Sequence, residues 1–212
     1  MLIGLTGFAR CGKDSAANIL RDGYGFKKYA FASELRRMAK AINPTISLRD
    51  VPDFIRNSFR CAGVHPETVR YTQLLETVGY ERAKEVPDFR RFLQKLGTEG
   101  VRDIFGEDAW VEALENRLVR NGLMEPANED NYAGVHGDAR VVITDVRFPN
   151  EAKWIHNWYG SLWRIERPGY GGDDLHPSEA HIAGLPADVE LIAATLDDLR
   201  YVVMTLMELE LS

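Results

Sequence analysis

A glycine-rich turn of fixed spacing near the N-terminus restricts this chain more than any other feature. Residues 7–13 read Gly-Phe-Ala-Arg-Cys-Gly-Lys, the pattern G-x-x-x-x-G-K. The short apolar run over residues 2–6 predicts a buried strand before the turn, and the apolar spacing over residues 12–21 predicts a helix after it. A strand, a glycine-rich turn and a helix in this order predict a loop whose backbone N–H groups face one anion.

The residues at the end of this turn indicate how a nucleotide would be held. Lys13 supplies a mobile positive charge for outer phosphates, and the helix that begins near Gly12 adds the positive end of its dipole. Asp14 stands where this pattern usually has Ser or Thr, and Ser15 follows it. Because a carboxylate repels phosphate unless a cation lies between them, we expect Asp14 to bind Mg²⁺ directly or through water. The alternative is a chance turn with Asp14 as a helix N-cap.

A second group of charged residues follows the clearest strand candidate, residues 141–144. In open parallel sheets, ligands bind at the carboxyl ends of the strands. Asp145 could hold Mg²⁺ or its water, Arg147 could neutralise phosphate charge, and Glu151 could orient Arg147 or contact the substrate. The alternative is a turn with an N-cap Asp and a surface ion pair.

The rest of the chain alternates strand and helix patterns, which predicts an α/β fold with a parallel sheet. Further strands are expected at residues 26–30, 162–165 and 189–193, and helices at 33–42, 91–105 and 107–119. Thr195 and Asp198 form a capping-box pattern that opens a C-terminal helix to about Leu209. Residues 44–90 indicate short helices with loops, and residues 121–138 a surface loop.

Composition limits the class of partner. The 212 residues carry 26 basic and 32 acidic side chains, a net charge of -6, which disfavours open binding of nucleic-acid polymers. Residues 1–40, however, hold eight basic and three acidic side chains, so a small anion could bind there. No apolar run approaches the roughly 18–20 residues that cross a bilayer. With two cysteines and no secretory signal, a cytoplasmic setting is expected.

Six segments in a fixed order resemble a known family. They are residues 7–15, Phe31-Ala-Ser-Glu-Leu-Arg36, Leu93-Gln-Lys-Leu-Gly-Thr-Glu99, Ala109-Trp110, Thr144-Asp-Val-Arg-Phe-Pro-Asn-Glu151 and His176-Pro-Ser-Glu179. The chain resembles the bacteriophage-type deoxynucleoside monophosphate kinases over nearly its whole length, least in residues 44–90 and 121–138. The Gly-Lys-Asp piece also looks like animal phosphomevalonate kinase, which shares the general architecture.

The resemblance implies a nucleoside-monophosphate-kinase-like fold, in which helices flank a parallel sheet. It implies one domain over residues 1–212, with a helical substrate-binding and lid region inserted at 44–138. The implied activity is transfer of phosphate from ATP to a deoxynucleoside monophosphate with Mg²⁺. In a phage-encoded protein the setting would be the host cytoplasm. Implied partners are these small molecules, with no polymer and no membrane, and a homodimer stays open.

Matching positions give the implied site residues. The ATP phosphates would contact Gly12, Lys13, Asp14, Ser15 and Ala16, and the metal ligands would be Asp14 and Asp145. The catalytic residues would be Arg10, Lys13, Asp145 and Arg147. The monophosphate pocket would comprise Arg36, Gln94, Gly97, Thr98, Arg102, Trp110, Asp145, Arg147 and Glu151. Members often have Lys where this chain has Arg36, so the charge is kept and the geometry differs.

Several alternatives stay open at this level. Trp110 offers a flat face for a base, but its spacing from Leu114 and Leu118 also fits the buried side of an amphipathic helix. Arg102 could equally lie on a solvated helix face, and His176–Glu179 fits a helix N-cap. The alternative functions are a phosphomevalonate kinase, a regulatory module that holds or hydrolyses a nucleotide, and a nucleic-acid-binding ATPase, which the acidic balance disfavours.

Overall fold

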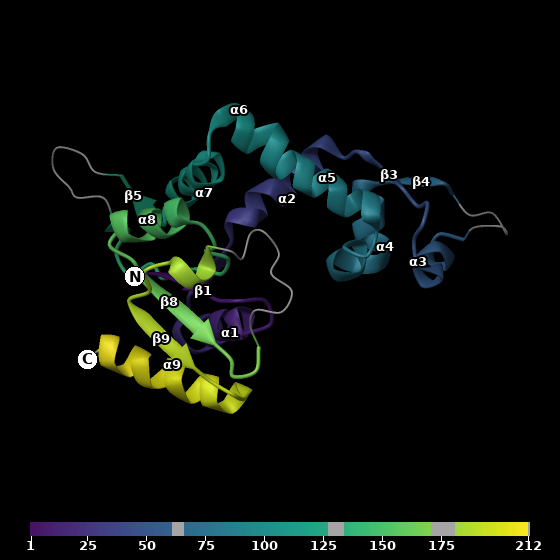
Figure 1. Ribbon diagram of the computed structural model, residues 1–212. Helices are drawn as coiled ribbons and strands as arrows, with labels where there is room; N and C mark the ends of the chain where they lie inside the picture. The colour runs from purple at the N-terminus through teal and green to yellow at the C-terminus, as the bar shows by residue number, and fades with distance from the viewer. Residues whose placement is uncertain (61–65, 127–133, 171–180, 212) are drawn as a thin grey trace. The chain divides into compact units, whose positions relative to one another are not determined.

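The computed structural model describes residues 1–60, 66–126, 134–170 and 181–211 (Figure 1). The elements are β1 (Leu2–Thr6), α1 (Lys13–Tyr24), β2 (Lys27–Tyr29), α2 (Phe31–Ile42), β3 (Thr45–Ser47), α3 (Asp53–Ser58), β4 (Thr68–Arg70), α4 (Tyr71–Ala83), α5 (Pro87–Gly97), the π-helix η1 (Thr98–Arg102), α6 (Asp103–Phe105), α7 (Ala109–Arg120), β5 (Met124–Glu125), β6 (Gly134–Val135), β7 (Val141–Ile143), α8 (Pro149–Asn157), β8 (Ser161–Glu166), the 3₁₀-helix η3 (Ile182–Gly184), β9 (Val189–Ile192) and α9 (Leu196–Glu210).

The largest sheet has five strands in the order β2-β7-β1-β8-β9, and every neighbouring pair is parallel. β1 is the central strand, paired with β7 on one side and β8 on the other, and all five of its residues are buried. Burial on both faces explains why this strand is a continuous apolar run. The predicted parallel α/β fold is therefore confirmed.

Alternate residues of β1 feed two separate cores. Ile3 and Leu5 pack in one apolar cluster with side chains of α1 and α9. Leu2 packs in the other cluster with side chains of α7 and α8. Gly4 faces the α8 side, where an added Cβ would lie 2.9 Å from the Ile155 side chain. Helices thus cover both faces of the sheet. In open parallel sheets of this kind, ligands bind at the carboxyl ends of the strands.

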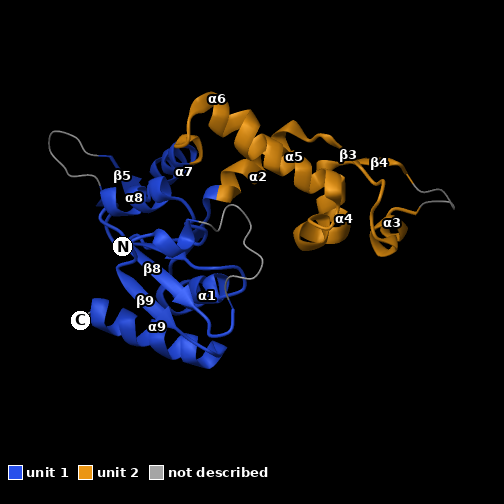
Figure 2. Ribbon diagram, viewed as in Figure 1, with its two compact units in different colours: residues 1–31, 111–212 blue, residues 32–110 orange. Residues whose placement is uncertain are grey.

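The chain divides into two compact units, drawn in separate colours in Figure 2. Unit 1 comprises residues 1–31 and 111–212 and contains the parallel sheet, and unit 2 comprises residues 32–110. Unit 2 has its own apolar core, which includes Ile46, Leu74 and Phe89. The family resemblance implies an insertion at 44–138, and the bounds of unit 2 differ from it at both ends. Ala39 of α2 packs in the unit 2 core, while Leu114 of α7 packs against the sheet of unit 1.

Unit 2 also contains elements that the sequence did not predict. β3 and β4 form an antiparallel pair, with Ile46 opposite Val69, inside a segment predicted to be helices and loops. Each strand has three residues and one buried side chain, too few to give a readable alternation. The helix predicted at 91–105 forms as three pieces, namely α5, the π-helix η1 and α6.

At the C-terminal end, the predicted capping box is confirmed. The Thr195 hydroxyl accepts from the Asp198 N–H at 3.1 Å, and the Asp198 carboxylate accepts from the Thr195 N–H at 2.9 Å. Residues 127–133 of the predicted loop, and the N-cap predicted at His176–Glu179, lie outside the described residues. None of the helices within the described ranges is both long enough and apolar enough to cross a membrane.

Candidate active site

The glycine-rich turn leaves the carboxyl end of β1 and leads directly into α1, as predicted. Gly7 has a φ of +139°, and a Cβ there would lie 2.3 Å from the Ile165 carbonyl oxygen. Any side chain at this position would collide with the backbone of β8, so the loop requires glycine. Arg10 is exposed and has a φ of +63°, a left-handed conformation that costs a non-glycine residue about 1–2 kcal/mol. Strained backbone of this kind concentrates at functional sites.

The Lys13 side chain folds back over the glycine-rich turn and binds its backbone carbonyls. Its ammonium group donates to the carbonyl oxygens of Gly7 at 2.7 Å and Phe8 at 2.6 Å, and it lies 3.6 Å from the buried Cys11 Sγ. The amino group therefore lies over the loop between β1 and α1. An anion bound by the loop would exchange these carbonyl contacts for stronger, charge-assisted hydrogen bonds.

The first turn of α1 brings together the remaining predicted nucleotide contacts. Gly12 is the N-cap of α1, so the alternative with Asp14 as N-cap is wrong. The Asp14 side chain is 89% exposed, and its carboxylate lies 3.6 Å from Lys28 Nζ. The methyl group of Ala16 is fully buried in the core, and its N–H donates to the Gly12 carbonyl at 2.9 Å. Its side chain therefore packs inside the protein, away from a bound phosphate.

The segment after β7 is held by two carboxylates. Asp145 Oδ1 accepts the N–H of Phe31 at 2.8 Å, which fastens the first residue of α2. Glu151 is 3% exposed, and its Oε2 accepts the N–H groups of Arg147 at 2.8 Å and Phe148 at 3.2 Å. Glu151 thus holds the backbone at Arg147 and Phe148 at the start of α8, while its role toward the Arg147 side chain or the substrate stays a prediction. Asp145 joins two elements instead of capping the helix that follows it.

These two segments lie at the same edge of the sheet. β1 and β7 are parallel neighbours, and the N–H of Val146 donates to the Leu5 carbonyl at 3.1 Å. In the described ranges, no three Asp, Glu, His or Cys side chains gather as a ready-made metal cage. The carboxylates of Asp14 and Asp145, which follow the ends of β1 and β7, are the kind of ligand that Mg²⁺ binds together with water and substrate phosphates.

In unit 2, α2 packs against the end of α5. A Cβ on Gly97 would lie 3.3 Å from the side chain of Leu35. Leu35 is the residue that precedes Arg36 on α2. The π-helix η1 begins at Thr98 and ends at Arg102, two residues predicted to bind the substrate. Single turns of π-helix occur frequently at functional sites. Thr98 is exposed and Arg102 is half-buried, while Gln94 lies exposed on the preceding turn.

Trp110 is hydrogen-bonded to the end of α5 through its indole N–H. It is 6% exposed, and Nε1 donates to the Gly97 carbonyl at 3.0 Å. Leu114 and Leu118 are fully buried on the same helix. Of the two interpretations of Trp110, this structure fits the core residue better than the open platform for a base. The hydrogen bond nevertheless ties Trp110 to the segment 94–102.

Arg36 has aromatic neighbours that sequence reasoning did not single out. Its Nε donates to the Ala32 carbonyl at 3.2 Å, and its guanidinium lies 5.0 Å from the centre of the Tyr80 ring. Close by, Tyr71 is fully buried, and burial raises the pKa of its hydroxyl from 10.0 to about 12. The only signal in the sequence was the frequency of aromatic and arginine residues in 44–90.

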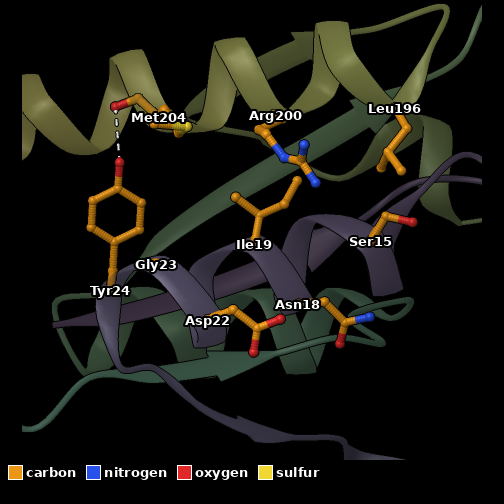
Figure 3. A pocket seen from close by; sticks show the side chains of 9 residues that line it. All are labelled: Ser15, Asn18, Ile19, Asp22, Gly23, Tyr24, Leu196, Arg200 and Met204. Carbon is orange, nitrogen blue, oxygen red and sulfur yellow. Dashed lines mark hydrogen bonds between the residues drawn. The ribbon is translucent and has the colours of Figure 1, made fainter.

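A cavity of about 470 Å³ lies between α1 and α9 (Figure 3). Its lining combines apolar and polar side chains: Ser15, Asn18, Ile19, Asp22, Gly23, Tyr24, Leu196, Arg200 and Met204. Near Met204, the Tyr24 hydroxyl donates to the Met204 carbonyl at 3.4 Å. Ser15 lines the cavity and belongs to the first turn of α1, which directly follows the glycine-rich turn. Part of the cavity therefore lies beside that turn.

Comparison with known proteins adds the family. No family model matches the chain. The chain is 30% identical over 200 residues to an Acanthamoeba polyphaga mimivirus protein provisionally named a deoxynucleotide monophosphate kinase, covering 91% of this chain and 88% of that protein. The chain belongs to the deoxynucleotide monophosphate kinase family. Kinase membership agrees with the phosphate-binding turn and the parallel sheet, and it makes this chain a P-loop kinase, a phosphotransferase.

Two solved structures show a weaker likeness. The dephospho-CoA kinase from Campylobacter jejuni is 14% identical with a TM-score of 0.46, covering 98% of this chain and 95% of that one. TT1252 from Thermus thermophilus is 18% identical with a TM-score of 0.40, covering 99% and 97%. At such scores neither likeness bears on the substrate.

Proposed function

We propose that this kinase transfers the terminal phosphate of ATP to a deoxynucleoside monophosphate, which gives ADP and the diphosphate. The observation that carries the proposal is that two charged segments follow the carboxyl ends of neighbouring parallel strands. The glycine-rich turn with Lys13 leaves β1, and the segment with Asp145 and Arg147 leaves the neighbouring strand β7. The name of the mimivirus relative supports the choice of acceptor.

The phosphate donor binds the glycine-rich turn. The N–H groups at the start of α1 and the dipole of that helix attract the β- and γ-phosphates. Lys13 leaves the carbonyls of Gly7 and Phe8 and donates to phosphate oxygens instead. Ser15 lies in the same first turn, where its hydroxyl contacts phosphate or supports the metal.

Asp14 and Asp145 are the residues that would hold Mg²⁺. The ion supplies neutralising charge to the phosphates when it is bound. Asp14 is exposed at the start of α1, with Lys28 3.6 Å away as its present cation. Because Lys28 also donates to Asn18 at 2.7 Å, it keeps a partner when Asp14 turns to the metal.

The acceptor needs orientation more than activation. The second pKa of a phosphate monoester is about 6, so an acceptor oxygen is already anionic near neutral pH and needs no strong general base. Arg10 and Arg147 stabilise the charge on the transferring group, and Glu151 keeps the Arg147 backbone in place. The residues of unit 2 proposed to bind the acceptor are Arg36, Gln94, Gly97, Thr98 and Arg102, with Trp110 acting through the Gly97 carbonyl. Gln94 offers both donors and acceptors to a base or sugar.

The cavity between α1 and α9 is our proposed location for the donor nucleoside. Ser15 belongs both to the turn that follows the phosphate loop and to the cavity lining. Apolar Ile19 and Leu196 suit a base, whereas Asn18 and Arg200 suit its polar edge. Both nucleotides are small molecules, in keeping with a chain of net charge -6 that acts on nucleotides and not on the polymer. We propose a cytoplasmic setting for this activity.

The test is a coupled assay of ADP release with ATP, Mg²⁺ and each of the four common deoxynucleoside monophosphates. We expect release to depend on at least one of them and Lys13→Ala to lower kcat by about 100-fold or more. Lys27→Ala, an exposed lysine on β2, is the matched control and should retain activity.

Two other results would change the assignment. ADP release that is independent of every monophosphate would favour a regulatory nucleotide-binding module. Turnover with phosphomevalonate, and with no nucleotide, would favour the phosphomevalonate kinase alternative.

A further inference from the structure

We propose that Tyr80 is a positioning residue that holds the Arg36 guanidinium in the orientation that binds the acceptor's phosphate. This inference rests on the proposed function, because it names how one acceptor-binding residue is prepared. All of the residues involved belong to unit 2.

Arg36 is a cation without an acidic partner in the described part of the chain, where its contacts are the Ala32 carbonyl at 3.2 Å and the Tyr80 ring. The next residue is a useful contrast. Arg37 lies 2.6 Å from Glu34, a carboxylate that is mostly buried. Of two adjacent arginines on α2, one is neutralised by the protein and the other is held by a carbonyl and an aromatic face. A guanidinium held in that way keeps its paired N–H donors for a planar anion such as phosphate.

The position of Tyr80 depends on a break in α4. Gly79 has a φ of 76° and a ψ of 165°, which interrupts the helix one residue before the tyrosine. Only glycine adopts this conformation without strain. Beyond the break, the Tyr80 ring packs edge-on against Phe89, with ring centres 6.0 Å apart at an interplanar angle of 71°. The Tyr80 ring is therefore held by its contact with Phe89 as well as by the Arg36 guanidinium.

A second cation shares the same ring. Lys84 Nζ lies 4.8 Å from the Tyr80 ring centre and donates to the two oxygens of Glu81 at 2.7 Å and 2.9 Å. The negative face of an aromatic ring attracts cations, so the ring draws two positive groups to one place. Glu81 neutralises Lys84, whereas Arg36 is left as the group available to an anion.

Tyr71 adds a buried polar group to this cluster. Its ring stacks on Phe89 at 5.1 Å, and its hydroxyl is buried and makes no hydrogen bond to any described residue. The charge of Arg36 acts on this hydroxyl, as does Tyr80. Buried polar groups without a partner are rare in folded proteins, and each one requires a physical explanation such as a functional role or a bound water. The unpartnered hydroxyl of Tyr71 is therefore a second unusual feature of the residues around Arg36 and Tyr80.

The test compares Tyr80→Leu with Tyr80→Phe in the full-length chain. The leucine variant loses the aromatic face, and we expect the KM for the preferred monophosphate to rise about 3- to 30-fold. The phenylalanine variant keeps the face, so its KM should stay within about twofold. In both variants the KM for ATP should be unchanged, because ATP binds residues of unit 1.

Phe54→Leu is the matched control, since it removes the ring that lies 5.8 Å from the Arg82 guanidinium in the same unit. An equal rise of the acceptor KM in this control, or an unchanged acceptor KM in Tyr80→Leu, would overturn the inference. Should Tyr80→Leu not fold, Tyr80→Met takes its place, because it also removes the aromatic face and leaves Arg36 unchanged. A rise of the acceptor KM of about threefold or more supports the proposal, and an unchanged value overturns it.

The proposed function fails in a different way. If the wild-type chain releases no ADP in response to any monophosphate, the acceptor assignment is wrong and this inference is overturned with it. If the wild-type chain responds and Tyr80→Leu matches it, only the inference is wrong.

Discussion

Several residues of this kinase make contacts that few other amino acids could make at the same position. Gly7 fits against the Ile165 carbonyl because it has no Cβ, and Lys13 finds carbonyl partners only because the loop curls around it. Tyr71 is the opposite case, because its hydroxyl is buried with no hydrogen bond to a described residue. A buried phenol of this kind favours its neutral form, which links the stability of the chain to pH.

Tyr71→Phe should change the response of stability to high pH. Burial raises the pKa of the folded-state hydroxyl from 10.0 to about 12. Its contribution is therefore complete below about pH 10 and is lost as the pH rises through about 12, by at most about 2–3 kcal/mol. Urea unfolding at several values between about pH 9 and pH 12 should show a steeper loss of stability in the wild type than in the variant.

Tyr201→Phe is the control for this measurement, because Tyr201 is 73% exposed. Its pH dependence should match that of the wild type. Parallel curves for Tyr71→Phe and the wild type would contradict the expected link between burial and ionisation.

At the scale of secondary-structure elements, one carboxylate joins two helices that cover the same face of the sheet. Glu115 on α7 accepts the indole N–H of Trp154 on α8 at 2.6 Å and that of Trp158, the C-cap residue of α8, at 3.1 Å. The two tryptophans are each 6% exposed. Because α8 follows Arg147, this clamp also fixes the helix whose first turn contains Glu151.

Glu115→Ala should lower the free energy of unfolding by about 2–4 kcal/mol, since it leaves two buried N–H donors without a partner. Urea unfolding followed by tryptophan fluorescence measures this change. Glu112→Ala, an exposed position one turn away on α7, should stay within about 0.5 kcal/mol of the wild type. Equal stability of the two variants would show that the clamp contributes nothing.

For the whole molecule, the division into two units separates the proposed donor and acceptor residues. Unit 1 holds the glycine-rich turn and the segment after β7, and unit 2 holds Arg36 and η1. Unit 2 has 13 basic and 12 acidic side chains, whereas the rest of the chain has 13 and 20. The proposed acceptor residues therefore belong to the less acidic part, where an anionic acceptor meets less repulsion.

Ligand-induced stabilisation should separate in the same way. At about 100 times its Kd, a ligand adds about 2.7 kcal/mol, which raises the Tm by roughly 5–10 °C for a chain of this size. We expect Lys13→Ala to lose most of the shift caused by Mg²⁺ and ATP, and Arg36→Ala to lose most of the shift caused by the monophosphate alone. Thermal scans with each ligand alone check this. Loss of both shifts in either variant would contradict the separation.

The sequence alone determined the features that depend on local spacing. These features are the glycine-rich turn, the buried strands β1 and β7 and the capping box of α9. Each depends on a few consecutive residues, because glycine, β-branched and capping residues determine the conformation of the backbone to which they belong. Local spacing also indicated that Asp145 and Arg147 follow a buried strand.

Only the tertiary structure decided what depends on residues far apart in the chain. Asp145 binds the N–H of Phe31, 114 residues away, and the Arg36 guanidinium lies over Tyr80. The limits of unit 2, the β3–β4 pair and the burial of Trp110 depend in the same way on which surfaces pack together. Such contacts are fixed by burial and shape in the folded chain, which no local pattern records.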